Sequence, residues 1–311
     1  MRTRTVAVAA ATAMLIGAVP ASAGPLIDPV EILGGPRYQY LPYSNVTYLG
    51  WTQNSARNPG RFHPVVSDDD GATWTRINEA GTTGFFGDIA TDTNEVIYQQ
   101  IDAGVSDLYF IDAATMIRTP ADALNTNRWE WGAKLSDAHI LFTRDLPAKD
   151  KRLLLLYDRD LDMTTLIKAY RWSRVDVWTG DVGSAYATWT TCNRSNCYAW
   201  WYEIAAGTRE KIPTLNDRPQ YAPVIDEIHA NAYWVRSGNA CGVNVGIWKA
   251  PLTSLGTPTK IAALPSGIDT DWRMSLEYDS VGGRIDLLFA RYDCAADGSD
   301  LYELRGVGTI P

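Results

Sequence analysis

The sequence predicts an all-β fold, a six-bladed β-propeller, and three observations support this prediction. Short phrases of apolar and aromatic residues recur at intervals close to 46 residues. Segments rich in β-branched and aromatic residues lie between these phrases and are bounded by turn residues. Convincing helical periodicity is absent. Short strands repeated about every 40 to 50 residues are typical of propeller blades built from four antiparallel strands.

The innermost strand of each blade is expected at a phrase that pairs arginine, a polar residue and an aromatic or apolar residue. The copies are RYQY from Arg37, RWEW from Arg128, RVDV from Arg174 and RPQY from Arg218, with weaker copies GFFGD at 84–88 and DWRM at 271–274. The second strands are expected at 46–51, 95–100, 139–144, 185–190, 231–236 and 284–290.

A third strand in each blade is expected to run into a charged residue. The copies end at Asp68, Asp112, Asp158, Glu203, Lys249 and Glu303. The last unit has no room for a full outer strand, whereas DPVEILGG at 28–35 precedes the first unit. This N-terminal strand is therefore expected to complete the sixth blade and close the ring, which protects the sheet edges. No composition shift marks a second domain, so residues 24–311 are predicted to form one propeller.

The N-terminal segment has the pattern of a secretory signal peptide. Arg2 and Arg4 precede an apolar run that ends in Ala21-Ser22-Ala23, which predicts cleavage near Ala23 and a secreted protein. No later segment is long and apolar enough to predict membrane insertion. Removing two arginines changes the formal charge from −8 to −10. An acidic chain repels phosphate backbones, so nucleic acid is not an expected partner.

Four cysteines in an exported chain favour disulfides over a metal site. Cys192 and Cys197 flank a four-residue turn, and their bridge should contribute about 2 kcal/mol. Cys241 and Cys294 would then close a 54-residue loop, worth about 4 kcal/mol. Zinc is disfavoured because only one close cysteine pair exists and the histidines lie elsewhere.

The repeated units resemble the TolB-like six-bladed propellers over nearly the whole mature chain. The resemblance rests on aromatic-led inner strands and on YFID-type outer strands such as 109–112. It implies a surface that binds proteins or peptides. Relatives of this family also occur fused to hydrolase domains. The resemblance of this sequence concerns the propeller units and includes no hydrolase domain.

The stretch SDDDGATW at 67–74 resembles the Asp-box turn of sialidases and other secreted propellers. Ser67 and Asp69 should hydrogen-bond the turn backbone, Gly71 should adopt a positive φ, and Trp74 should pack between strands. Its predicted role is structural, because the resemblance places this turn away from any catalytic site.

A ligand site is expected at the channel mouth, where the repeated phrases would gather guanidinium groups and aromatic faces. Guanidinium forks suit carboxylates, and aromatic faces suit sugars. The expected ligand-binding residues are Arg37, Tyr40, Arg128, Trp131, Arg174, Arg218, Tyr221 and Arg273, with Gln39, Asp88, Glu130, Asp176, Gln220 and Asp271 nearby. An alternative is that each arginine pairs with an acid of the neighbouring blade and only staples the ring.

Two functions from different classes follow from this site. The first is a secreted, non-enzymatic module that binds a peptide, a protein or an anionic glycan from the extracellular space or envelope. The second is a sialidase- or glycosidase-like enzyme that uses carboxylates such as Glu130 and Asp176, provided that two acids lie at the required separation. A purely structural envelope protein is a third possibility.

No cofactor is expected from the sequence, and calcium remains an alternative at one type of turn. DRDLD at 158–162 places acids at alternating positions but lacks the glycine and glutamate of an EF-hand loop. SDDD at 67–70 and DGSD at 297–300 raise the same alternative. Asn45 and Asn193 satisfy the glycosylation sequon.

Overall fold

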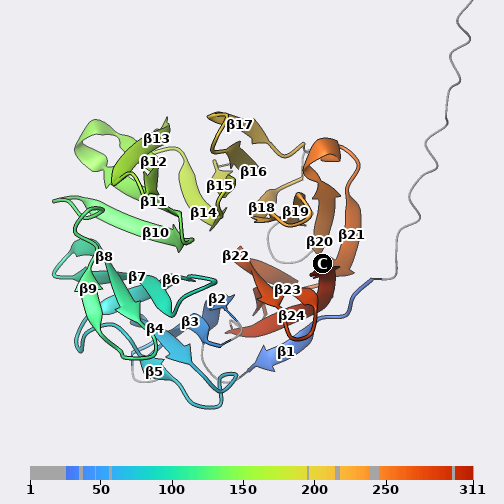
Figure 1. Ribbon diagram of the computed structural model, residues 1–311, viewed down its shortest axis with the longest axis horizontal. Coiled ribbons are helices and arrows are strands. Elements are labelled where there is room, and N and C mark those ends of the chain that lie inside the picture. Colours follow the sequence, from blue (N-terminus) through green and yellow to red (C-terminus); the bar gives the residue numbers. More distant parts are fainter. Residues whose placement is uncertain are drawn as a thin grey trace, which may run out of the picture.

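The computed structural model describes residues 26–34, 38–45, 47–55, 58–194, 196–213, 218–237, 245–295 and 298–310, without the side chains of residues 271 and 272. Six four-stranded antiparallel sheets surround a common centre, as Figure 1 shows. The predicted six-bladed propeller is confirmed. The expected signal peptide at 1–23 lies outside the described residues.

The strands of each blade follow one another along the chain. Blade 1 contains β2 (Gln39–Ser44), β3 (Leu49–Asn54), β4 (Phe62–Ser67) and β5 (Thr75–Arg76). Blade 2 contains β6 (Thr83–Ile89), β7 (Glu95–Asp102), β8 (Val105–Asp112) and β9 (Arg118–Pro120). Blade 3 contains β10 (Trp129–Leu135), β11 (His139–Leu146), β12 (Lys151–Asp158) and β13 (Met163–Tyr170), with a 3₁₀ turn at Pro147–Lys149.

The second half of the ring repeats this order. Blade 4 contains β14 (Asp176–Val182), β15 (Tyr186–Cys192), β16 (Cys197–Glu203) and β17 (Thr208–Lys211). Blade 5 contains β18 (Gln220–Asp226), β19 (Asn231–Arg236), β20 (Gly246–Pro251) and β21 (Thr259–Ala263), with a 3₁₀ turn at Leu252–Ser254. Blade 6 contains β22 (Ile268–Asp279), β23 (Arg284–Asp293), β24 (Gly298–Thr309) and β1 (Val30–Leu33).

The first strand of each blade forms the inner wall of the ring. Each of these strands contacts the first strand of both neighbouring blades, and β22 contacts β2, so the circle is continuous. The second strands carry the largest buried side chains, among them Trp51, Trp189 and Trp234. They are buried because blades pack face to face on both sides, as aligned sheets do.

The N-terminal strand supplies the outer strand of the last blade. Val30 pairs with Glu303 and Leu33 with Leu301, and the Tyr302 hydroxyl donates to Glu31 Oε2 at 2.9 Å. Figure 1 shows β1 beside β24, at opposite ends of the colour scale. The first and last strands of the chain are thereby held in one sheet.

The SDDDGATW turn joins β4 to β5 and is fixed by its own side chains. Gly71 N donates to Ser67 Oγ at 2.8 Å, and Thr73 N donates to Asp69 Oδ1 at 2.8 Å. Gly71 adopts φ 86°, and a Cβ there would lie 3.1 Å from the Leu33 side chain. The turn therefore packs against β1. The expectation that Trp74 packs between strands is wrong, since 42% of its surface is exposed.

One of the two expected disulfides is present. Cys192 and Cys197 end and begin the paired strands β15 and β16, and they are bonded with their Cα atoms 4.1 Å apart. Cys241 lies outside the described residues, so its pairing with Cys294 stays a prediction. Within the part of the chain that is described, no helix is long and apolar enough to cross a membrane.

Candidate functional site

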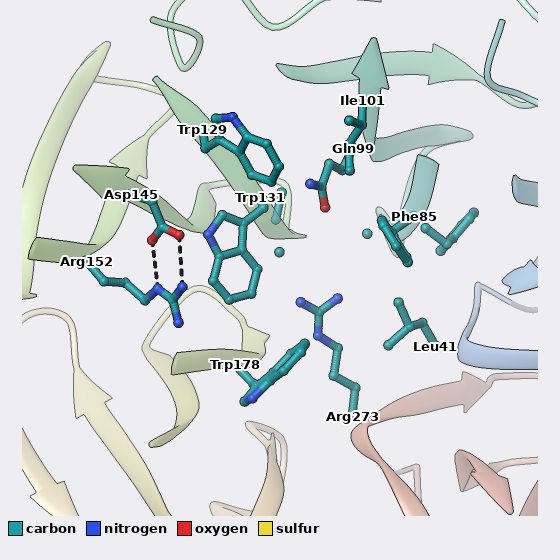
Figure 2. A pocket seen from close by; sticks show the side chains of 14 residues that line it. Leu41, Phe85, Gln99, Ile101, Trp129, Trp131, Asp145, Arg152, Trp178 and Arg273 are labelled. Carbon is teal, nitrogen blue, oxygen red and sulfur yellow. Dashed lines mark hydrogen bonds and ion pairs between the residues drawn. The ribbon is translucent and has the colours of Figure 1, made fainter. Parts of the chain in front are cut away.

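A cavity of about 280 Å³ opens at the inner strands of the propeller (Figure 2). Its walls come mainly from blades 2 and 3, with Leu41 from blade 1, Trp178 from blade 4 and Arg273 from blade 6. Most of its lining is aromatic or aliphatic. The aromatic residues that line it are Phe85, Phe86, Trp129, Trp131 and Trp178. The guanidinium of Arg273 points into the space between Phe85, Trp131 and Trp178.

Irregularities in the inner strands shape this cavity. In β10, Gly132 and Ala133 together face one residue of β11, and Gly132 has φ 66°. The equivalent bulge of β2 places Leu41 at φ 58°. A bulge re-aims the side chains around it and is common next to functional sites. The inner strands therefore turn Leu41 and the Gly132 backbone toward the pocket.

Arg273 occupies the widest of these irregularities. Residues 271–273 of β22 lie between the pairs Thr270–Arg291 and Met274–Phe289, so three residues face Ala290 alone. The Arg273 side chain is only 3% exposed. A Cβ on Gly132 would lie 2.7 Å from Arg273 Nη2. The missing side chain at Gly132 thus makes room for the guanidinium group.

Hydroxyl groups hold the bulged backbone of β10. Thr143 Oγ1 of β11 donates to the Trp131 carbonyl at 2.9 Å, and Thr179 Oγ1 of β14 donates to the Gly132 carbonyl. The carbonyls freed by the bulge are therefore satisfied from both sides, as buried backbone groups require. Trp129 is held as well, because its Nε1 donates to the Gly104 carbonyl at 2.8 Å.

A buried ion pair forms the wall behind Trp131. Arg152 donates from Nε and Nη2 to the two Asp145 oxygens at 2.7 and 2.8 Å, and from Nη1 to Asp176 at 3.0 Å. Its guanidinium carbon lies 4.7 Å from the centre of the Trp131 ring. Trp172 Nε1 adds a bond of 3.0 Å to Asp145. These contacts orient the indole of Trp131 and join blade 3 to blade 4.

Three ionisable residues, Asp88, Lys134 and Asp181, follow the cavity residues along the inner strands β6, β10 and β14. Lys134 is fully buried, donates to the Gly87 carbonyl at 2.9 Å and stands 3.3 Å from the centre of the Tyr43 ring. Burial raises the pKa of Asp88 well above its usual range, and nearby Asp181 adds to this shift. Burial also raises the pKa of Asp181 to about 6, against the opposing effect of Lys134.

Two of the eight expected ligand-binding residues, Trp131 and Arg273, meet in the cavity. Tyr221 is buried in the core between blades 5 and 6, where its hydroxyl donates to Asp269. Tyr40 packs edge-on against Phe62 at 5.5 Å. Neither tyrosine belongs to the cavity lining.

The arginines of the repeated phrase fall in the turns that precede the inner strands. Arg128 and Arg174 are exposed, and Arg218 is half-buried. None of these three lines the cavity or forms an ion pair with another described residue. Arg37 lies outside the described residues, as does the side chain of Asp271. An ion pair between neighbouring blades, the alternative role considered for these arginines, is formed by Arg152 of blade 3 and Asp176 of blade 4.

The two carboxylates considered for catalysis are both engaged by arginines. Glu130 is fully buried and accepts from Arg144 Nε and Thr126 Oγ1, each at 2.6 Å. Asp176 is mostly exposed and accepts from Arg152. Among the described residues, no group of three or more His, Cys, Asp and Glu side chains is arranged to hold a metal ion.

Several cavity residues were not expected from the sequence. Phe85 belongs to the weak phrase GFFGD, and Trp178 directly follows RVDV. A sequence signal exists for Trp129, because it lies two residues before Trp131 on the same inner strand, and alternate residues of a strand share one face. Gln99 and Arg152 come from second and third strands, and only the packing of neighbouring blades brings them to the cavity.

The fold is similar to those of solved TolB propellers, while no protein-family model and no curated protein matches the chain. TolB from Acinetobacter baumannii is 11% identical with a TM-score of 0.52; the match covers 88% of this chain and 64% of that chain. A protein assigned as TolB from Agrobacterium tumefaciens is 12% identical, with coverages of 88% and 92% and a TM-score of 0.57.

An enzyme is found among the same fold neighbours. Oligogalacturonate lyase from Vibrio parahaemolyticus is 10% identical, with coverages of 88% and 81% and a TM-score of 0.52. At these identities the likeness concerns the fold alone. The chain spans 64% of the length of the Acinetobacter TolB. The six-bladed propeller is thus the class that the structure defines, with a fold similar to that of TolB, and one fold can carry unrelated functions.

Proposed function

We propose that this protein is a secreted binding module whose ligand, an anionic group of a peptide, protein or glycan, enters the cavity at the channel mouth. The observation that supports this proposal is the combination of aromatic walls with the inward-pointing guanidinium of Arg273. Apolar concave sites with a few convergent polar groups are the usual form of ligand sites. Export through the expected signal peptide at 1–23 is part of the proposal.

The support comes from preorganisation as well as composition. Trp129 and Trp131 are held by a hydrogen bond to Gly104 and by the Arg152 guanidinium, respectively. Rings that are already fixed lose little conformational freedom when a ligand arrives. TolB-like fold neighbours agree with a binding role at the coarse level of the fold.

A second candidate function is a carbohydrate-active enzyme, and one observation favours it. Asp88 directly follows Gly87, which lines the cavity, and burial raises the pKa of the Asp88 carboxyl. A raised pKa is what a general acid requires. Hydrolysis or elimination that releases new sugar ends, and that disappears in Asp88→Asn, would establish this function.

The proposal is tested with the mature chain 24–311 on glycan and peptide arrays. Trp129→Ala is the informative variant, because Trp129 is 44% exposed and its removal should spare the fold while abolishing the array signal. Trp74→Ala is the matched control, an exposed tryptophan outside the cavity. The double variant R128A/R174A tests whether the turn arginines, which the sequence predicted as ligand-binding residues, form the site instead. A signal lost only in that double variant would move the site to the turn arginines, and blank arrays would contradict the proposal.

A further inference from the structure

The cavity carries an inference about the chemical class of its ligand, which rests on the proposed function. We propose that it receives an aromatic ring bearing a carboxylate, supplied either by a free aromatic acid or by a C-terminal aromatic residue of a peptide. The walls would hold the ring, and Arg273 would bind the carboxylate. Four features of the cavity lead to this class: its volume, its small number of polar groups, the geometry of its aromatic walls and the position of its charge.

The size of the cavity limits the ligand to about one residue. Ligand pockets for drug-sized molecules measure about 300 to 1,000 Å³, and this cavity has about 280 Å³. A single ring with a short acid side chain fits such a volume. An oligosaccharide or a folded epitope could place only one unit inside it, with the remainder lying beyond the exposed ring of Trp129.

The polar side chains of the lining are few, and those of Gln99, Asp145 and Arg152 are engaged in hydrogen bonds. Asp145 and Arg152 form a two-bonded ion pair. The Gln99 amide nitrogen donates to Ser106 Oγ at 2.7 Å. A sugar ring carries several hydroxyl groups, and each one buried without a partner costs about 1 to 3 kcal/mol. An aromatic ring has no such requirement, so the lining favours it over a sugar.

The walls offer the geometry that aromatic ligands use. Trp131 and Trp178 meet edge to face, with ring centres 5.6 Å apart and planes at 79°. Phe85 faces them across the cavity in Figure 2. A ligand ring between these walls meets one indole face and one indole edge, both favourable arrangements for aromatic pairs.

The positive charge of Arg273 is placed to bind an anionic group beside the aromatic rings. Arg152 forms ion pairs with Asp145 and Asp176 and lies behind Trp131. Arg273 comes from the opposite blade, and its guanidinium stands between the rings and not behind them. A guanidinium fork binds a carboxylate through two parallel N–H···O bonds. A ring lying against Trp131 and Trp178 therefore directs its acid group to Arg273.

The experiment is calorimetric titration of the mature chain 24–311 with matched probes. The acid probes are 3-phenylpropionate and the peptide Gly-Gly-Gly-Phe, and their controls are 3-phenylpropionamide and Gly-Gly-Gly-Phe-amide. We expect each acid to bind at least about tenfold more tightly than its amide, because one charge-assisted pair is lost. The difference should disappear in Arg273→Met and persist in Arg209→Met, a variant at an exposed arginine of outer strand β17.

The outcomes distinguish a free aromatic acid from a C-terminal aromatic residue. They also distinguish failure of this inference from failure of the proposed binding function. Tighter binding of the peptide identifies a C-terminal residue, and equal or tighter binding of phenylpropionate identifies a free acid. Equal binding of acids and amides overturns the inference. If glucuronate binds in a Trp129-dependent manner while the aromatic acids do not, the inference fails and the binding function stands. If no probe binds and the arrays are blank, both fail.

Discussion

Gly132 shows at the scale of one residue how the cavity depends on a backbone detail. It adopts φ 66°, a conformation that glycine takes without steric cost. The equivalent bulges of β2 and β18 contain Leu41 at φ 58° and Ala222 at φ 52°, so the fold accepts a side chain at this place. What distinguishes Gly132 is its neighbour, the guanidinium of Arg273. The glycine therefore serves the site more than the fold.

The variant Gly132→Ala tests this role. The left-handed conformation should cost about 1 to 2 kcal/mol in the free energy of unfolding, and the new Cβ should displace the Arg273 guanidinium. We expect a folded protein that has lost binding of the acid probes, measured by urea unfolding and calorimetry. Ala222→Gly is the matched control, since it changes the equivalent bulge away from the cavity and should leave binding intact. Unchanged binding in Gly132→Ala would show that the close approach has no role.

At the scale of elements, the N-terminal strand and the SDDDGATW turn depend on each other. Leu33 of β1 lies against the Cα of Gly71, within the turn that Ser67 and Asp69 hold by hydrogen bonds. The turn therefore does more than join β4 to β5: it contacts the strand that completes the sixth blade. This contact gives a physical role to a sequence pattern that by itself indicates only a tight turn.

The variant Leu33→Ala should weaken this junction. Leu33 is half-buried, so the loss is expected near the lower end of the range for leucine truncation, about 2 kcal/mol, and should be visible as a lower Tm. Val30→Ala is the control on the same strand, because Val30 is exposed. If Leu33→Ala unfolds at the temperature of the wild type, the contact between Leu33 and the turn does not stabilise the ring.

At the scale of the whole molecule, the channel gathers charges that no single blade contains. Asp88, Lys134 and Asp181 come from blades 2, 3 and 4, and Tyr43 comes from blade 1. Each lies on an inner strand, which faces the inner strands of its neighbours around the ring. Burial in this common space is the reason that the pKa values of both aspartates are raised.

The raised pKa of Asp181 makes stability depend on pH. The folded protein holds the proton up to about pH 6, whereas the unfolded chain releases it near 3.8. The native state therefore binds more protons in this window, and the free energy of unfolding should fall by about 2 kcal/mol as pH rises from 4 to 7. Asp181→Asn should remove that part of the slope in urea unfolding. The exposed Asp122→Asn is the control, and a slope in Asp181→Asn parallel to the wild type would contradict the prediction.

Much of the architecture could be predicted because each strand carries its own local signal. The second-strand segments, such as 139–144 within β11 (His139–Leu146), show the enrichment in β-branched and aromatic residues that fits a pleated, buried surface. The site could be predicted only in part. Trp131 and Arg273 lie in repeated phrases, but Arg128, Arg174 and Arg218 do too, and these remain in the turns. A repeat gives equivalent positions, and it does not say which of them face the axis after each bulge.

The sequence alone determined the all-β fold, the number of blades and the Cys192–Cys197 bridge, because strand periodicity, repeat length and a four-residue turn are local properties of the chain. Only the tertiary structure decided which side chains share a cavity. The bulges of β10 and β22 rotate Trp131 and Arg273 toward one another from blades three positions apart along the chain. The physical reason is that side-chain direction depends on backbone irregularities and on the packing of neighbouring blades, neither of which leaves a periodic trace in the sequence.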